Sequence, residues 1–149
     1  MRVLNVEDNP IKHHHIKSAL NRLGITDIAL EESENSAIIS VLESIENNNP
    51  YDLIITDMQF PLFSNGRPDD DAGMTFIAEL KEHNIDIPII VCSSFRLRIS
   101  EVLGCVHYSN NTDLWEELRK LIAEIGGKGE IKRGYNESDF DFIKVPREM

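Results

Sequence analysis

The segment Tyr51–Pro61, YDLIITDMQFP, decides the fold class. Its residues 53–56 are apolar or β-branched, which is typical of a strand buried on both faces of a parallel sheet. Asp57 follows directly, so we expect it at the carboxyl end of this strand. In open α/β sheets, the loops at that end line the crevice where ligands bind. Asp57 is therefore either a functional carboxylate or, as the ordinary alternative, the first residue of a turn.

Strand-like and helix-like segments alternate along the rest of the chain. Strands are predicted over 2–6, 28–30, 53–56, 87–92 and 105–108. Helices are predicted over 10–23, from a cap at Ser33 to about 46, from about 71 through Leu80, over 99–103, and over 114–125. Five such strand–helix units predict an α/β fold. We expect a flavodoxin-like, doubly wound sheet of five parallel strands in the order 2-1-3-4-5, with helices on both faces.

Composition predicts a single domain. The chain has 149 residues, of which 41% are hydrophobic and 28% charged. We assign residues 1–125 to the domain and residues 126–149 to a C-terminal tail of unknown structure, which is a flexible terminus, a packed strand pair or a docking peptide. The formal charge of −11 and the lack of a basic run argue against nucleic-acid binding. The N-terminus lacks the long apolar segment of a signal peptide or membrane helix, so we expect a cytoplasmic protein.

Two further carboxylates follow the first predicted strand. If the first and third strands are neighbours, Glu7 and Asp8 converge with Asp57 at one edge of the sheet. Three carboxylates repel one another unless a hard divalent cation lies between them, and Mg²⁺ suits such a set of oxygen ligands. Ser93 ends the fourth strand, and its hydroxyl is placed to donate a hydrogen bond to a phosphoryl group on Asp57.

Four stretches in this order carry a family resemblance. They are VEDN at 6–9, DLIITDMQFP at 52–61, PIIVCSS at 88–94 and GCVHYSNNTDL at 104–114. Over about residues 1–125 the chain resembles the receiver domains of two-component response regulators. The resemblance implies that Asp57 is the phosphoacceptor and Asp8 a direct Mg²⁺ ligand. It also implies that Glu7 helps to hold the metal, often through water, and that Gln59 offers its backbone carbonyl.

The resemblance also implies a switch, and here the sequence departs from the family. Phosphorylation of such a domain pulls the residue at Ser93 toward the phosphoryl group and lets the aromatic residue at Tyr108 turn inward. The family has a lysine three residues after that aromatic residue, whereas this chain has Asn111, which brings no charge. Arg96 or Arg98 is a possible substitute.

A second departure is a longer loop before the third predicted helix. Residues 62–71, LFSNGRPDDD, stand where the family has a short turn. We expect their three aspartates, at 69–71, to lie at a solvated helix N-terminus rather than to bind metal. The run of His13, His14 and His15 cannot close on one ion, because successive helical side chains point about 100° apart.

These features favour a stand-alone signalling receiver over other classes. Its expected partners are a histidine kinase or phosphotransfer protein and a downstream protein, and it is not itself an enzyme. The alternative is a degenerate receiver-like module that binds partners without phosphorylation, as the missing lysine suggests. A phosphatase with an aspartyl nucleophile needs a second aspartate at the position of Gln59. A dinucleotide-binding oxidoreductase needs Gly-x-Gly after the first strand, and VEDNPIK has none.

Overall fold

The computed structural model describes the backbone of residues 1–129 and the side chains of residues 1–125. Our predictions for residues 130–149 lie outside the described residues. The element order is β1 (Arg2–Val6), α1 (Pro10–Arg22), β2 (Asp27–Glu31), α2 (Glu34–Glu46), β3 (Leu53–Thr56), β4 (Phe60–Pro61), β5 (Pro68–Asp69), α3 (Ala72–Glu82), β6 (Ile89–Ser93), β7 (Gly104–His107) and α4 (Leu114–Gly129).

The main sheet has five parallel strands in the order β2-β1-β3-β6-β7. Counted along the chain without the short β4–β5 pair, this is the order 2-1-3-4-5, so the predicted topology is confirmed. The strand order reverses between β1 and β3, which is where doubly wound sheets open a crevice at their carboxyl ends. Asp8 follows β1 and Asp57 follows β3, and the two strands are direct neighbours.

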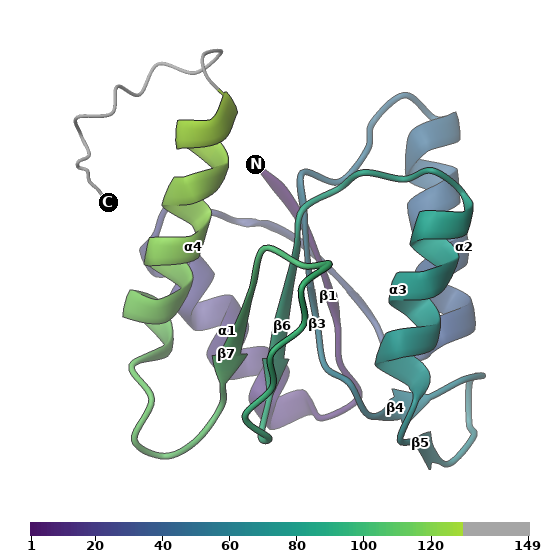
Figure 1. The fold of residues 1–149 in the computed structure, drawn as a ribbon, viewed down its shortest axis with the longest axis horizontal. Helices are drawn as coiled ribbons and strands as arrows, with labels where there is room; N and C mark the ends of the chain where they lie inside the picture. Colours follow the sequence, from purple (N-terminus) through teal and green to yellow (C-terminus); the bar gives the residue numbers. More distant parts are fainter. Residues whose placement is uncertain (130–149) are drawn as a thin grey trace.

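Helices cover both faces of the sheet, α1 and α4 on one and α2 and α3 on the other (Figure 1). Their starts follow from capping residues. The Asn9 side chain accepts hydrogen bonds from the backbone amides of Ile11 and Lys12, and Ser33 Oγ accepts one from Ser36. Gly24 follows α1 with φ +86°, a left-handed conformation that glycine adopts without a steric cost.

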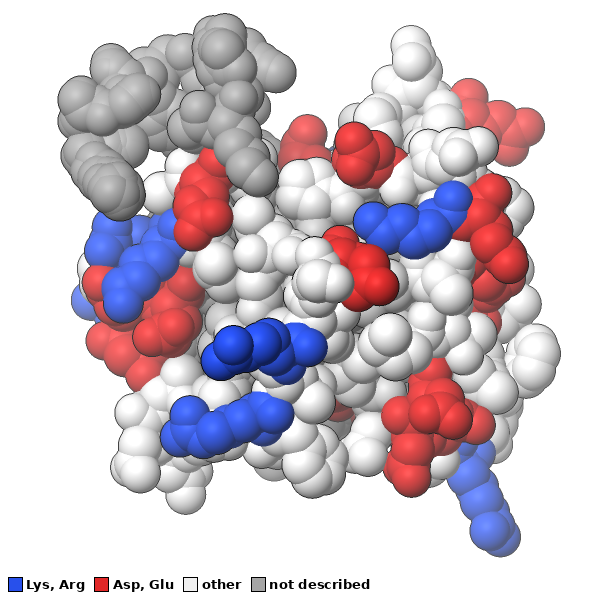
Figure 2. Space-filling view, viewed as in Figure 1, with Lys and Arg blue, Asp and Glu red and all other residues white. Residues whose placement is uncertain are grey.

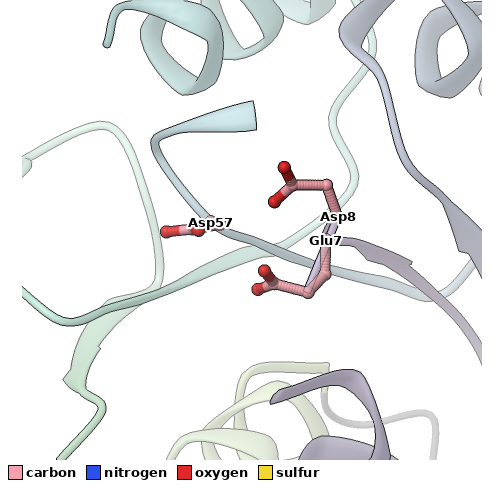
Figure 3. Close-up of side chains that lie close together, drawn as sticks. All are labelled: Glu7, Asp8 and Asp57. Carbon is pink, nitrogen blue, oxygen red and sulfur yellow. The ribbon is translucent and has the colours of Figure 1, made fainter. Parts of the chain in front are cut away.

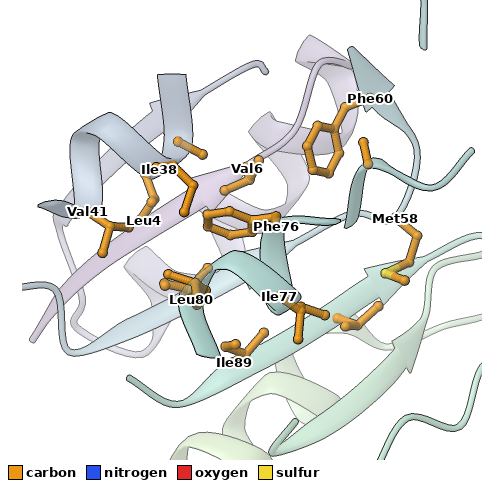
Figure 4. Packing of buried hydrophobic residues seen from close by; sticks show 14 of the residues in the cluster. Leu4, Val6, Ile38, Val41, Met58, Phe60, Phe76, Ile77, Leu80 and Ile89 are labelled. Carbon is orange, nitrogen blue, oxygen red and sulfur yellow. The ribbon is translucent and has the colours of Figure 1, made fainter. Parts of the chain in front are cut away.

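Two apolar clusters hold these layers together. Under α2 and α3 the cluster contains Leu4, Val6, Ile54 and Phe76, which are fully buried (Figure 4). Under α1 and α4 the second cluster contains Val3, Ile55 and other buried residues. Successive residues along each of these two strands therefore point to opposite faces of the sheet, and both faces are apolar. This explains why Leu53–Thr56 lacks the alternation of a half-exposed strand.

Two of the helix predictions are wrong. Residues 99–103 form no helix. Only ten residues link Ser93 to Gly104, and they form bends, a turn and irregular chain. The last helix was expected to end before Gly126 but continues to Gly129. Glycine costs roughly 1 kcal/mol in a helix relative to alanine, which weakens the helix without stopping it.

The inserted loop is ordered by a short hairpin. Phe60 pairs with Asp69 and Pro61 with Pro68 in an antiparallel β4–β5 ladder, so the loop 62–67 projects from the main sheet. Asp71 then precedes α3. On the face shown in Figure 2, acidic and basic side chains are interspersed, and no continuous basic surface appears. Among the described residues, none of the helices has the length and apolar character needed to cross a membrane.

Candidate functional site

The carboxylates of Glu7, Asp8 and Asp57 meet where β1 and β3 end (Figure 3). One oxygen from each lies within 4.8 Å of one oxygen from each of the others. The backbone fixes this arrangement, since the Glu7 amide donates to Glu31 O on β2 and the Asp57 amide donates to Val6 O on β1, each at 3.0 Å. The predicted cluster is therefore present, held by the ladder of the sheet itself.

Burial makes this cluster electrostatically costly. Glu7 is 2% exposed, and desolvation, opposed by Lys12 and reinforced by Asp57, raises its pKa to about 7. Desolvation also raises the pKa of Asp8 above its usual range, and the Asp57 charge adds to this. The site thus gathers negative charge that a cation would stabilise.

Lys12 provides positive charge inside the site, and the sequence analysis missed it. Its Nζ lies 3.1 Å from Glu7 Oε1 and 3.3 Å from Asp57 Oδ1, and it donates a hydrogen bond to Cys92 O at 2.7 Å. The residue is only 5% exposed. Desolvation lowers the pKa of Lys12, but the attraction of Glu7 and Asp57 outweighs it and the net pKa is raised.

A signal for Lys12 was present in the sequence. Lys12 shares the buried face of α1 with Ile16, Ala19 and Leu20, at the spacing of one helical stripe. A lysine on the apolar stripe of a helix is unusual, and Lys12 lies in the first turn of α1, soon after the acidic pair Glu7 and Asp8. Because helical side chains tilt toward the N-terminus, the amine is carried back to the ends of β1 and β3.

Ser93 and Gln59 lie at the same edge of the sheet. Ser93 ends β6, is 2% exposed, and accepts a hydrogen bond from the Phe95 amide at 3.1 Å through its hydroxyl oxygen. The Gln59 side chain donates to Asp70 Oδ1 at 3.0 Å, away from the carboxylate cluster. Asp69 accepts from the Asp71 amide at 2.8 Å. None of the three loop aspartates joins the cluster of potential metal ligands found among the described residues.

Tyr108 follows β7 and lies against α1. Its hydroxyl is hydrogen-bonded to His15 Nδ1 at 2.6 Å, and its ring centroid is 5.3 Å from Lys12 Nζ. Asn111 lies in the exposed loop after Tyr108, where its backbone amide donates to Ser109 Oγ at 3.3 Å. Arg96 and Arg98 are also exposed and form no ion pair within the described part of the chain.

A family model of the response regulator receiver domain matches residues 3–103, about two thirds of the chain. The chain belongs to this family. The match covers β1 through the approach to β7 and includes Glu7, Asp8, Asp57 and Ser93. The predicted family is thereby confirmed, and the protein is a receiver domain of two-component response regulators.

Solved structures show the same fold. The response regulator protein TrrA from Thermotoga maritima, in complex with Mg²⁺-BeF, is 25% identical with a TM-score of 0.61, over 84% of this chain and 98% of that one. A CheY-like receiver domain from Methylobacillus flagellatus is 16% identical with a TM-score of 0.63, over 85% and 98%.

One curated relative is much longer than this receiver. The protein-glutamate methylesterase/protein-glutamine glutaminase of Treponema denticola is 25% identical over 154 residues, 93% of this chain. The chain spans 38% of that protein's length.

The donor set fits Mg²⁺. All three side chains offer carboxylate oxygens, the hard ligands that this ion prefers, and no sulfur or imidazole ligand is part of the cluster. Glu7 Oε1 is buried and has no hydrogen-bond partner among the described residues, although it is paired in charge with Lys12. A buried, incompletely satisfied carboxylate of this kind is suited to binding a cation or its water shell.

Proposed function

We propose that this receiver domain accepts a phosphoryl group on Asp57 and passes the change to a protein partner. The observation that carries the proposal is the meeting of Glu7, Asp8 and Asp57 at the carboxyl ends of neighbouring strands, with Lys12 beside them. The alternative, in which Asp57 only begins a turn, explains neither its two acidic neighbours, Glu7 and Asp8, nor the buried amine of Lys12. The family match supports the same reading.

Mg²⁺ is the cofactor we assign to the site. Asp8 and Asp57 would bind it directly, Glu7 would hold it directly or through water, and the Gln59 carbonyl would complete the protein ligands. When bound, the ion neutralises charge on the phosphoryl oxygens during transfer. The protein's own contribution is to hold the Asp57 carboxylate rigidly, since the Met58 amide donates to Asp57 Oδ1 at 2.7 Å.

We assign the response to phosphorylation to Ser93 and Tyr108. Ser93 is the last residue of β6, the strand beside β3, and its hydroxyl would donate a hydrogen bond to a phosphoryl oxygen. Tyr108 would leave its hydrogen bond with His15 and turn inward. The resemblance places Asn111 at the family's lysine position, so the loop supplies no charge there. The partners are a histidine kinase or phosphotransfer protein and a downstream protein.

The test uses the full chain, Mg²⁺ and beryllofluoride, which mimics an acyl phosphate. Titration with Mg²⁺ alone is expected to shift the amide signals of residues 7, 8, 57 and 59. Adding beryllofluoride is expected to shift those of 57, 93 and 108 further, and Asp57→Asn is expected to abolish this second change. If millimolar Mg²⁺ and beryllofluoride leave these signals in place, the proposed function is wrong.

A further inference from the structure

The strongest unassigned feature of the molecule is the buried amine of Lys12. An ionised lysine has three N–H donors, and here three oxygens lie within 3.3 Å of the amine nitrogen, those of Glu7, Asp57 and the Cys92 carbonyl. Among the described residues, no other lysine or arginine lies within 4.0 Å of the Asp57 carboxylate. Asp57 is thus paired with a cation from α1, not from the loop that holds Asn111.

The position of this lysine is electrostatically unusual. It lies in the first turn of α1, where the helix dipole disfavours positive charge. Burial of its ammonium group carries a further cost. The carboxylates of Glu7 and Asp57, with the Cys92 carbonyl, offset these costs, so the groups of the site itself hold the amine in place.

We propose that Lys12 is a catalytic residue that takes the role of the absent loop lysine in phosphorylation of Asp57. This inference rests on the proposed function. In the reaction with acetyl phosphate, an Asp57 oxygen forms a bond to phosphorus, the bond from phosphorus to the acetate oxygen breaks, and acetate leaves with the electron pair. The Lys12 ammonium stabilises charge on the phosphoryl oxygens, because such transfer depends on positioned cations.

The experiment compares the wild type with Lys12→Met, which keeps the length of the side chain and removes the charge. Lys17→Met is the matched control, since Lys17 is an exposed residue of the same helix. The rate of mass gain with acetyl phosphate and Mg²⁺ is measured for each protein, together with its affinity for Mg²⁺ alone. Removal of one positioned donor costs about 100-fold in rate in other enzymes, and we expect a loss of that order for Lys12→Met and none for Lys17→Met.

The Mg²⁺ affinity separates chemistry from folding. Lys12→Met removes a positive charge beside the metal ligands, so it is expected to bind Mg²⁺ more tightly while it reacts more slowly. An unchanged rate would overturn the inference, and so would loss of both rate and Mg²⁺ affinity, which indicates a structural role. If Mg²⁺ binds normally but neither wild type nor variant gains mass, the proposed phosphorylation itself fails.

Discussion

At the scale of single residues, Gly73 controls how closely α3 approaches Asp57. It lies in the first turn of α3, where its amide donates to Met58 O at 3.0 Å. A Cβ added at Gly73 would lie 2.6 Å from the Met58 Cα and 2.8 Å from the Asp57 carbonyl oxygen. Both neighbours are backbone atoms, so they cannot move aside without displacing Asp57.

Gly73→Ala is therefore expected to destabilise the fold and to disturb the site. Overpacking of this kind costs roughly 1–3 kcal/mol, although alanine is the better helix former. Denaturant unfolding measures the loss, and Mg²⁺ titration followed at the Asp57 amide measures the displacement. Thr75→Ala, at an exposed position of the same helix, is the control and should neither lower the stability nor displace the Asp57 amide signal. Equal stability of Gly73→Ala and wild type would contradict the tight contact.

The residues of the site differ in how far the sequence reveals them. Glu7, Asp8, Asp57 and Ser93 were predictable because each lies at or just after the end of a strand, and strand ends gather at one edge of a parallel sheet. Lys12 was not predicted, because a lysine in a helix is ordinarily solvent-exposed and its role depends on which face of α1 is buried. Lys12 contacts Glu7, Asp57 and Cys92, which lie 5, 45 and 80 positions away from it in the sequence.

At the scale of secondary-structure elements, a buried carboxyl group links α2 to α3. Glu34, in the first turn of α2, is 7% exposed and lies beside Glu79 of α3. Its Oε2 has no hydrogen-bond partner among the described residues, so the neutral, protonated form of the carboxyl group is favoured. Burial, with the hydrogen bond and charge of Glu79, raises the pKa of Glu34 to about 8.

This raised pKa predicts a pH-dependent stability. The folded protein holds the proton more tightly than the unfolded chain, whose glutamate has a pKa near 4.5. The stabilisation is thus complete below pH 4.5, decreases as the pH rises and is lost above about pH 8. Glu34→Gln keeps a neutral side chain, so its free energy of unfolding should fall less steeply across this window. Glu43→Gln, exposed on the same helix, should match the wild type, and equal slopes for all three would contradict the raised pKa of Glu34.

Elements with a clear hydrophobic period were predictable, and irregular ones were not. Helices α1 and α2 begin close to their predicted starts, because a capping residue precedes an apolar stripe in each. Helix α3 also begins close to its predicted start, although the Asp71 side chain makes no capping hydrogen bond. The segment 94–103 has exposed residues such as Phe95 and Leu97 and no regular period. Its turn, and the β4–β5 hairpin within the inserted loop, depend on tertiary packing that a local pattern does not encode.

At the scale of the whole molecule, strand order brings the site together. Buried strands separated by helices predict a parallel sheet, and right-handed crossovers restrict how those strands are arranged. The order 2-1-3-4-5 then makes β1 and β3 neighbours, although 46 residues separate the end of β1 from the start of β3. The acidic cluster is a consequence of that order.

The central claim is that Asp57 accepts a phosphoryl group, and the mass of the intact protein tests it most directly. Wild type and Asp57→Asn are incubated with Mg²⁺ and acetyl phosphate, and the mass of each is followed with time. The wild type is expected to gain the mass of one phosphoryl group, only when Mg²⁺ is present, and Asp57→Asn is expected to gain none. A wild type that binds Mg²⁺ yet gains no mass, or an equal gain in Asp57→Asn, would contradict the account.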